Sequence, residues 1–158
     1  MRSRAAIAGH PLHPAMVAIP VGAFTVALVS DVVGLFGGGE GWDRTAQYAI
    51  WIGLVGALLA ALLGFVDYFG VTMSRAAKRL ATIHMLLNLT AVVLYAASCW
   101  LRDEAAETPT LAVLLSTVGF LILSGSGWLG GELAFKHKVG VVENADPEAT
   151  AIGQRESA

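Results

Sequence analysis

The stretch TAQYAIWIGLVGALLAALLGFVDYFG, residues 45–70, decides the fold because it is long and apolar enough to cross a lipid bilayer. A helix needs about 20 consecutive apolar residues to span the hydrocarbon core. This stretch exceeds that length, and Asp67 is its only acidic or basic residue. We therefore interpret it as a transmembrane helix.

Three more stretches have the same character, and the breaks between the four are short enough to force antiparallel neighbours. The sequence therefore predicts an all-α, integral membrane, antiparallel four-helix bundle formed by residues 1–141. Residues 142–158 are charged and rich in small residues, so we expect a disordered cytoplasmic tail. No internal sequence repeat is found. The other three expected spans are residues 15–36, 80–101 and 109–131.

The composition agrees with a membrane domain. The 158 residues are 56% hydrophobic and 14% charged, with a mean hydropathy of +0.66, whereas soluble domains carry about 25% charged residues. The net charge of -2 offers no basic surface for nucleic acid. Cys99 is the only cysteine, which excludes an intramolecular disulfide or a CxxC site. The N-terminus is basic like a signal peptide, but the apolar run after it has spanning length, so we expect a retained first helix.

The basic residues predict the orientation. Only Arg44 and Arg102 fall on the side of the membrane opposite the N-terminus, and the other eight lie on the N-terminal side. Lys and Arg are enriched in cytoplasmic loops, so both termini are expected in the cytoplasm. The eight are Arg2, Arg4, Arg75, Lys78, Arg79, Lys136, Lys138 and Arg155.

Small residues share one face in two of the predicted helices. At such spacing they let helix backbones approach closely in a membrane, and they would also leave room for a flat cofactor. The second helix carries Gly53, Gly56, Ala60 and Gly64 on the face of Asp67, and the fourth carries Ser116, Gly119, Gly127 and Gly130.

The segment GHPLHPA, residues 9–15, opens the first helix. Proline suits the first turn of a helix, where its missing N–H is not needed, so Pro14 places His13 at the cap and His10 just outside. Two imidazoles fixed by prolines favour a ligand-binding pair. The alternative is an interfacial entry motif without a ligand.

His84 lies about one turn inside the third helix, and Asn88, Ala91, Tyr95 and Cys99 continue its face. A polar stripe must point into the bundle because lipid offers no hydrogen bonds. His84 is therefore predicted to bind a ligand or handle protons, with interhelical hydrogen bonding as the alternative.

Two further polar residues lie on the N-terminal side. Asp67 could orient a histidine ring, as carboxylates often do beside a metal, or it could pair with Arg75 or Arg79. His137 follows the fourth helix and is either a metal ligand or a juxtamembrane residue among lysines.

Asp31 lies near the opposite side, about 9 Å inside the end of the first helix. An intramembrane acid is a functional-site hypothesis by default. We expect a structural, hydrogen-bonded acid whose partner is Arg44, Gln47 or Tyr95, with a proton path to the histidines as the lesser alternative.

Four motifs together resemble the domain of unknown function 2231 family of bacterial membrane proteins. They are GHPLHPA, LLGFVDYF, IHMLLN and SGWLGGELAFKHKVGV, and the likeness covers residues 7–142. It implies a multi-pass protein of the bacterial inner membrane, of a kind sometimes joined to a Rieske-type iron–sulfur domain, which points to electron transfer with a partner protein. The matching positions are His10, His13, Asp67, His84, Asn88 and His137.

The function favoured by the sequence is cofactor binding for electron transfer. His10, His13, His84 and Asn88 would hold haem b, with glycines leaving space for the ring and Arg75 or Arg79 neutralising its propionates. The same histidines, with Asp67 or His137, would instead hold a transition-metal ion. The alternatives are a structural subunit without cofactor and a proton-linked transport module, and the chain could form a homo-oligomer. No hydrolase or transferase motif is present, so whether the protein is an enzyme stays open.

Overall fold

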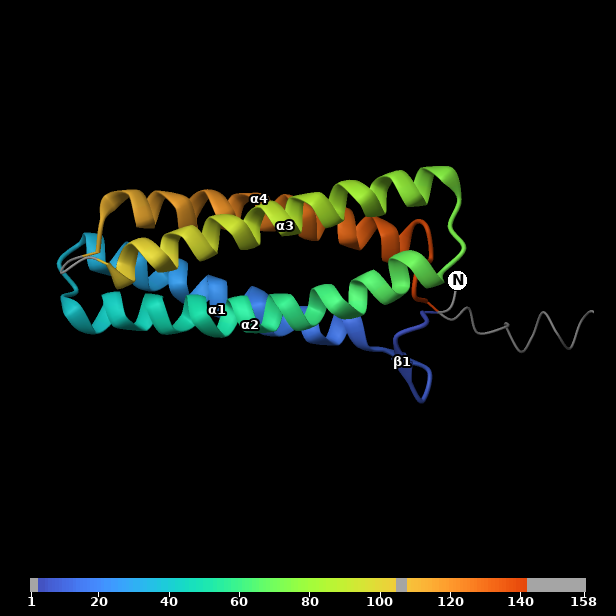
Figure 1. Ribbon diagram of the computed structural model, residues 1–158, viewed down its shortest axis with the longest axis horizontal. Helices are drawn as coiled ribbons and strands as arrows, with labels where there is room; N and C mark the ends of the chain where they lie inside the picture. The colour runs from blue at the N-terminus through green and yellow to red at the C-terminus, as the bar shows by residue number, and fades with distance from the viewer. Residues whose placement is uncertain (1–2, 105–107, 142–158) are drawn as a thin grey trace, which may run out of the picture.

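The computed structural model describes residues 3–104 and 108–141. Four helices run antiparallel, and Figure 1 shows them as two helix hairpins stacked on each other, α1 with α2 and α3 with α4. A hairpin of two short strands precedes the first helix. The elements are β1 Ala6–Ile7, β2 His10–Pro11, α1 Leu12–Leu35, α2 Glu40–Gly70, α3 Arg75–Asp103 and α4 Thr110–Phe135.

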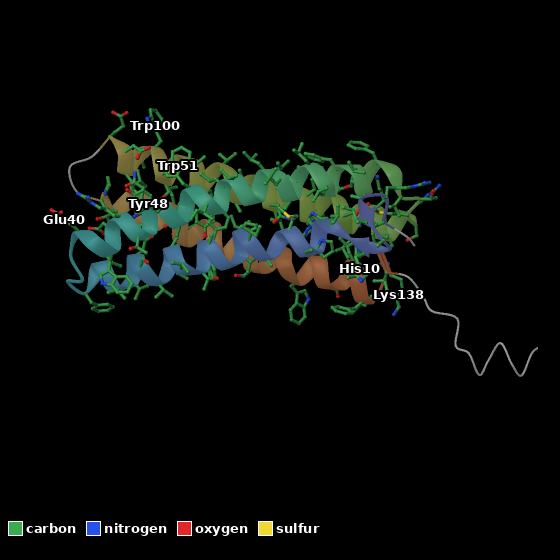
Figure 2. All side chains as sticks on the ribbon, turned by 90° about the horizontal axis from the view of Figure 1, so that it is seen from below. His10, Glu40, Tyr48, Trp51, Trp100 and Lys138 are labelled. Atoms are coloured by element: carbon green, nitrogen blue, oxygen red, sulfur yellow. The ribbon has the colours of Figure 1, made fainter. Side chains whose placement is uncertain are left out.

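All four helices are long and apolar enough to cross a membrane. Large apolar side chains such as those of Leu58, Val93 and Leu121 point away from the bundle and are more than half exposed, which suits contact with lipid tails. Trp51 and Trp100 are also exposed and lie toward the end of the bundle that holds Glu40 (Figure 2). Indoles are typical of the membrane–water boundary. The predicted all-α membrane bundle is confirmed.

The start of α1 differs from the expectation. The helix begins at Leu12, with Pro11 as its cap, so His13 is the second residue of the helix and not its cap. Pro14 still lies in the first turn, where no N–H is needed. Before the helix the chain reverses at Ala8 and Gly9, both with positive φ, and Leu12 N donates to Ala5 O at 2.8 Å.

The other helices also extend beyond the expected spans: α3 begins at Arg75 and α4 ends at Phe135. α2 begins at Glu40, about one turn earlier than expected, and its first turn carries Glu40 and Asp43, whose charges suit the positive end of the helix dipole. α3 continues to Asp103, so Arg102 lies in its last turn and not in a loop.

Most of the predicted small residues of α2 and α4 lie where a neighbouring helix comes close, whereas Gly127 has nothing within 4 Å of an added Cβ. A Cβ atom added at Gly53 would lie 2.4 Å from Cε1 of Phe24, and one added at Gly119 would lie 3.1 Å from Cε2 of Tyr95. Glycine is needed at Gly53 because real Cβ atoms do not approach other atoms so closely.

The two hairpins repeat the same packing. In the first, Phe24 of α1 contacts Gly53 and His13 contacts Gly64. In the second hairpin Tyr95 contacts Gly119, and His84 contacts Gly130. Tyr95 and His84 come 71 positions after Phe24 and His13, and the two glycines come 66 positions after Gly53 and Gly64. The chain therefore contains a packing repeat, although sequence comparison of the halves reveals none.

Equivalent residues of the two halves meet at the centre of the bundle. The rings of Phe24 and Tyr95 stack with centroids 3.7 Å apart and planes 7° apart. Asp31 and Arg102, which are also 71 positions apart, form an ion pair. These contacts lie at the interface between the two hairpins, on the long axis of the bundle. Both histidines also lie at this interface.

Candidate functional site

A cavity of about 230 Å³ lies between the two hairpins. We call it the histidine cavity, because His13 and His84 line it from opposite halves of the chain. It extends from the N-terminal end of the bundle, at Pro11 and Val139, to Phe24 in the middle of α1. Almost all of its wall is apolar, which suits a ligand with a large apolar surface.

The imidazole of His13 is fixed by α2. Its Nδ1 lies 2.7 Å from the carbonyl oxygen of Ala60, and the ring lies against Gly64, where an added Cβ would come 3.1 Å from Cε1. A carbonyl oxygen only accepts, so Nδ1 carries the proton and Nε2 keeps its lone pair. No hydrogen bond within residues 3–104 and 108–141 engages Nε2.

The imidazole of His84 is fixed by α4 in the same way. Its Nδ1 lies 2.8 Å from the carbonyl oxygen of Ser126, and the ring lies against Gly130. The Ser126 hydroxyl donates to the His84 carbonyl oxygen at 3.1 Å. Asn88, one turn further along α3, places its amide nitrogen 3.0 Å from Nε2 of His84.

The polar stripe of α3 points into the bundle, as predicted. Ala91, Tyr95 and Cys99 are all at least 98% buried, and Asn88 lines the histidine cavity. His84 bonds to Ser126 of α4, and Asn88 bonds to His84 within α3, so interhelical hydrogen bonding is part of the role of His84.

Asp67 does not orient a histidine and does not pair with Arg75 or Arg79. Its Oδ1 accepts hydrogen bonds from the backbone N–H groups of Arg4 and Ala5, at 2.7 and 3.0 Å, and the Ser3 hydroxyl also donates to the carboxylate. The carboxylate captures these groups because the segment before the β-hairpin runs back over the end of α2. Asp67 therefore holds the start of the described chain against the bundle.

His10 and His137 lie at the same end of the bundle but outside the described lining of the histidine cavity. His10 is exposed and lies in β2, where its Nδ1 is 3.1 Å from the carbonyl oxygen of Ala8. His137 follows α4. Among the described residues, no three His, Cys, Asp or Glu side chains are placed to hold one metal ion. The structure thus brings together His13, His84 and Asn88.

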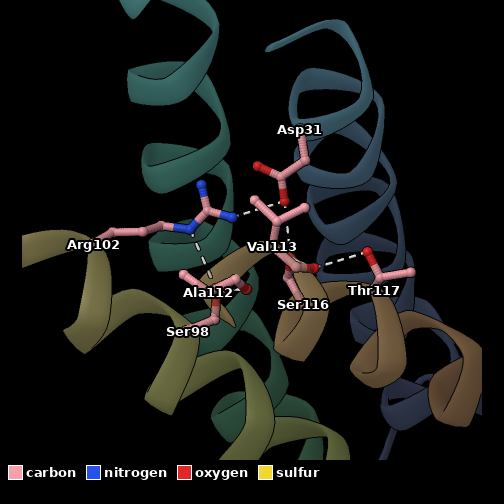
Figure 3. Close-up of polar contacts among 7 residues, drawn as sticks. All are labelled: Asp31, Ser98, Arg102, Ala112, Val113, Ser116 and Thr117. Carbon is pink, nitrogen blue, oxygen red and sulfur yellow. Dashed lines mark hydrogen bonds and ion pairs between the residues drawn. The ribbon is translucent and has the colours of Figure 1, made fainter. Parts of the chain in front are cut away.

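The opposite end of the bundle holds a buried polar cluster around Asp31 (Figure 3). The partner of Asp31 is Arg102, whose Nη2 donates to Oδ2 at 2.7 Å, and not Arg44, Gln47 or Tyr95. Ser116 donates to the same oxygen at 2.8 Å. Both charged side chains are at least 98% buried.

The expected partners of Asp31 are engaged elsewhere. Arg44 lies 3.9 Å from Glu40, one turn away on α2, and Gln47 bonds to Asp103. The ring of Tyr95 stacks on Phe24, and its buried hydroxyl bonds to no described residue. The neutralising ion pair favours the structural interpretation of Asp31 over a proton path.

Sequence reasoning missed Ser98, Ser126 and the burial of Arg102, and the last two carried a signal. Ser126 is a polar residue inside an apolar helix and is fully buried. Arg102 is the basic residue nearest the far end of α3, which in an antiparallel bundle lies at the same depth as Asp31. The sequence places it in a loop because the expected helix ends at residue 101.

A family model described as "Predicted membrane protein (DUF2231)" matches residues 9–143. No curated protein and no solved structure matches the chain.

Proposed function

Since the chain belongs to this family of membrane proteins, we propose that it binds a haem in the histidine cavity and transfers electrons. We place it in the inner membrane of a bacterium, with the cavity end toward the cytoplasm and a redox partner protein docking at that side. The observation that carries the proposal is the pair of imidazoles, each fixed through Nδ1 by a backbone carbonyl, at one apolar cavity.

The way the rings are fixed supports ligation. Histidines that bind metals almost always donate the other ring N–H to a carbonyl or carboxylate, which sets the tautomer and orients the ring. His13 and His84 both donate from Nδ1 to a carbonyl oxygen. Nε2 is then the ring atom that faces a ligand, and on His13 it bonds to no described residue, whereas on His84 it meets the Asn88 amide.

The number of ligands favours haem over a bare ion. A zinc site takes three or four protein ligands, whereas haem iron takes its four equatorial nitrogens from the porphyrin and one or two axial ligands from the protein. The described residues offer no third His, Cys, Asp or Glu to the two imidazoles. Gly64 and Gly130 make room for the imidazoles, and Gly127, where nothing lies within 4 Å of an added Cβ, leaves room in the wall for a flat macrocycle.

The charge at the N-terminal end suits a haem inserted with its propionates outward. Arg75 and Arg79 are exposed at the start of α3, at the end where the cavity begins. They would neutralise the carboxylates at the membrane surface, where lipid headgroups and water also solvate them.

The test is to purify the protein in detergent from cells supplied with a haem precursor and to measure haem and metal content per chain. We expect a Soret band for the wild type and loss of most of it in His13→Ala. His10→Ala is the matched control, because His10 is exposed and outside the cavity lining, and it should keep the haem.

Two glycine variants test the cavity itself. Neither Gly127 nor Gly125 has any atom within 4 Å of an added Cβ, but only Gly127 lines the cavity. Gly127→Leu should therefore exclude haem while Gly125→Leu retains it. A folded wild-type protein that takes up neither haem nor metal would refute the proposal and leave a structural subunit as the better interpretation.

A further inference from the structure

The two hairpins fix their histidines alike through Nδ1, but the surroundings of Nε2 differ between His13 and His84. His13 is followed four residues later by Val17, and His84 by Asn88, and these two positions are equivalent in the packing repeat. Valine has no polar group to offer. Asn88 instead donates to Nε2 of His84.

The orientation of the Asn88 amide is set by its two partners. Its nitrogen lies 3.0 Å from Nε2 of His84 and 3.0 Å from the carbonyl oxygen of His84. The carbonyl oxygen only accepts, and Nε2 must accept because Nδ1 carries the ring proton. Both partners therefore need the NH₂ group, and the lone pair of His84 Nε2 is engaged.

His84 is also held more firmly than His13. Its Nδ1 meets both the carbonyl oxygen and the hydroxyl oxygen of Ser126, at 2.8 and 2.9 Å, whereas the equivalent position in α2 is Ala60, which offers a carbonyl oxygen alone. Moving His84 onto a metal would break its bond to Asn88 and leave a polar group unpaired in an apolar cavity, which is unfavourable. His13 meets no such obstacle.

From this difference we infer that His13 alone ligates the iron and that Asn88 holds His84 away, so that the sixth coordination position takes a small external ligand. This rests on the proposed function, since it requires a haem in the cavity. The apolar wall disfavours an unpaired anion, so the ligand class is a small neutral molecule such as a diatomic gas. The site would then bind such a ligand in addition to exchanging electrons.

The test compares the absorption spectra and carbon monoxide binding of the haem-loaded protein and its variants. The wild type should be five-coordinate and high-spin when reduced, and it should bind carbon monoxide. Asn88→Val copies the first half of the repeat into the second and frees Nε2 of His84. It should become six-coordinate and low-spin, and internal competition should lower its carbon monoxide affinity by about tenfold or more.

Further variants keep the test decisive if Asn88→Val folds poorly. Asn88→Ala frees the same nitrogen and should give the same change, while Leu86→Ala, which alters an exposed residue of α3 outside the cavity lining, should not. His84→Ala should keep the haem, whereas His13→Ala should lose it.

The outcomes separate the two proposals. A wild type that binds haem but is six-coordinate, or a His84→Ala variant that loses haem, overturns the inference and leaves the proposed function standing. Absence of haem from the wild type removes the proposed function, and the inference falls with it.

Discussion

Asp31 and Arg102 are both buried, so the charge of each is stabilised mainly by the other. They lie at equivalent positions of the two halves and bond across the middle of the bundle at 2.7 Å. Removing one partner of a buried ion pair leaves an unpaired charge and costs about 3–5 kcal/mol. Because the positions are equivalent, the charges should also be interchangeable.

We expect Asp31→Arg and Arg102→Asp to lower the thermal unfolding midpoint strongly when made singly, since each places two like charges in contact. The double variant should recover most of the loss. The measurement is the unfolding midpoint in detergent, followed by tryptophan fluorescence. A double variant no more stable than the worse single variant would show that Ser98 and Ser116, which bond to Arg102 and Asp31, fix the polarity of the pair.

The residues of the site were only partly predictable. His84 and Asn88 are four positions apart on one helix, so their contact follows from helix geometry alone. The partners of Asp31 and Asp67 come from other parts of the chain. Which of several polar residues at one depth forms the bond depends on helix rotation, and the spacing of residues along one helix does not set that.

At the scale of the helix, the close contacts of α1 with α2 and of α3 with α4 depend on glycine. Gly53→Ala should lower the free energy of unfolding by about 1–3 kcal/mol, because its Cβ would lie 2.4 Å from the Phe24 ring. Gly119→Ala should cost less, since its nearest contact is 3.1 Å.

The matched control for these variants is Gly22→Ala in α1. Nothing lies within 4 Å of an added Cβ there, and alanine favours a helix by up to about 1 kcal/mol over glycine, so the control should be neutral or stabilising. All three are compared by unfolding in the same detergent. Equal losses in all three would show that the glycines act through backbone flexibility and not through packing.

The helices and their small faces could be predicted because length, hydropathy and a period of 3.6 residues are local properties. The packing repeat was missed because its identical pairs are few, His13 with His84 and two pairs of glycines, and its other pairs differ in chemistry. Phe24 corresponds to Tyr95 and Asp31 to Arg102. What repeats is a large residue against a glycine, or one charge against its opposite, and such complementarity is visible only after the halves are packed together.

For the whole molecule, the distribution of basic residues predicts that the cavity end faces the cytoplasm. Cys99 is the only cysteine and is 98% buried, so the native chain gives little background in labelling with a membrane-impermeant maleimide. Glu40→Cys, at the far end of the bundle, should react in intact bacterial cells. Lys136→Cys, beside the cavity end, should react only after the cells are opened, and the reverse pattern would invert the orientation.

The three hydrogen-bonding groups that Asp67 receives from residues 3–5 have a practical consequence. They hold the start of the described chain at the end of the bundle where the cavity begins. A soluble electron-carrier domain fused directly ahead of Ser3 would therefore lie close to the opening of the histidine cavity, without a long flexible linker. Its effective concentration there would depend in part on one carboxylate, and Asp67→Ala would lower it, leaving the bonds of Arg4 to Gly70 and of Leu12 to Ala5 to hold the segment.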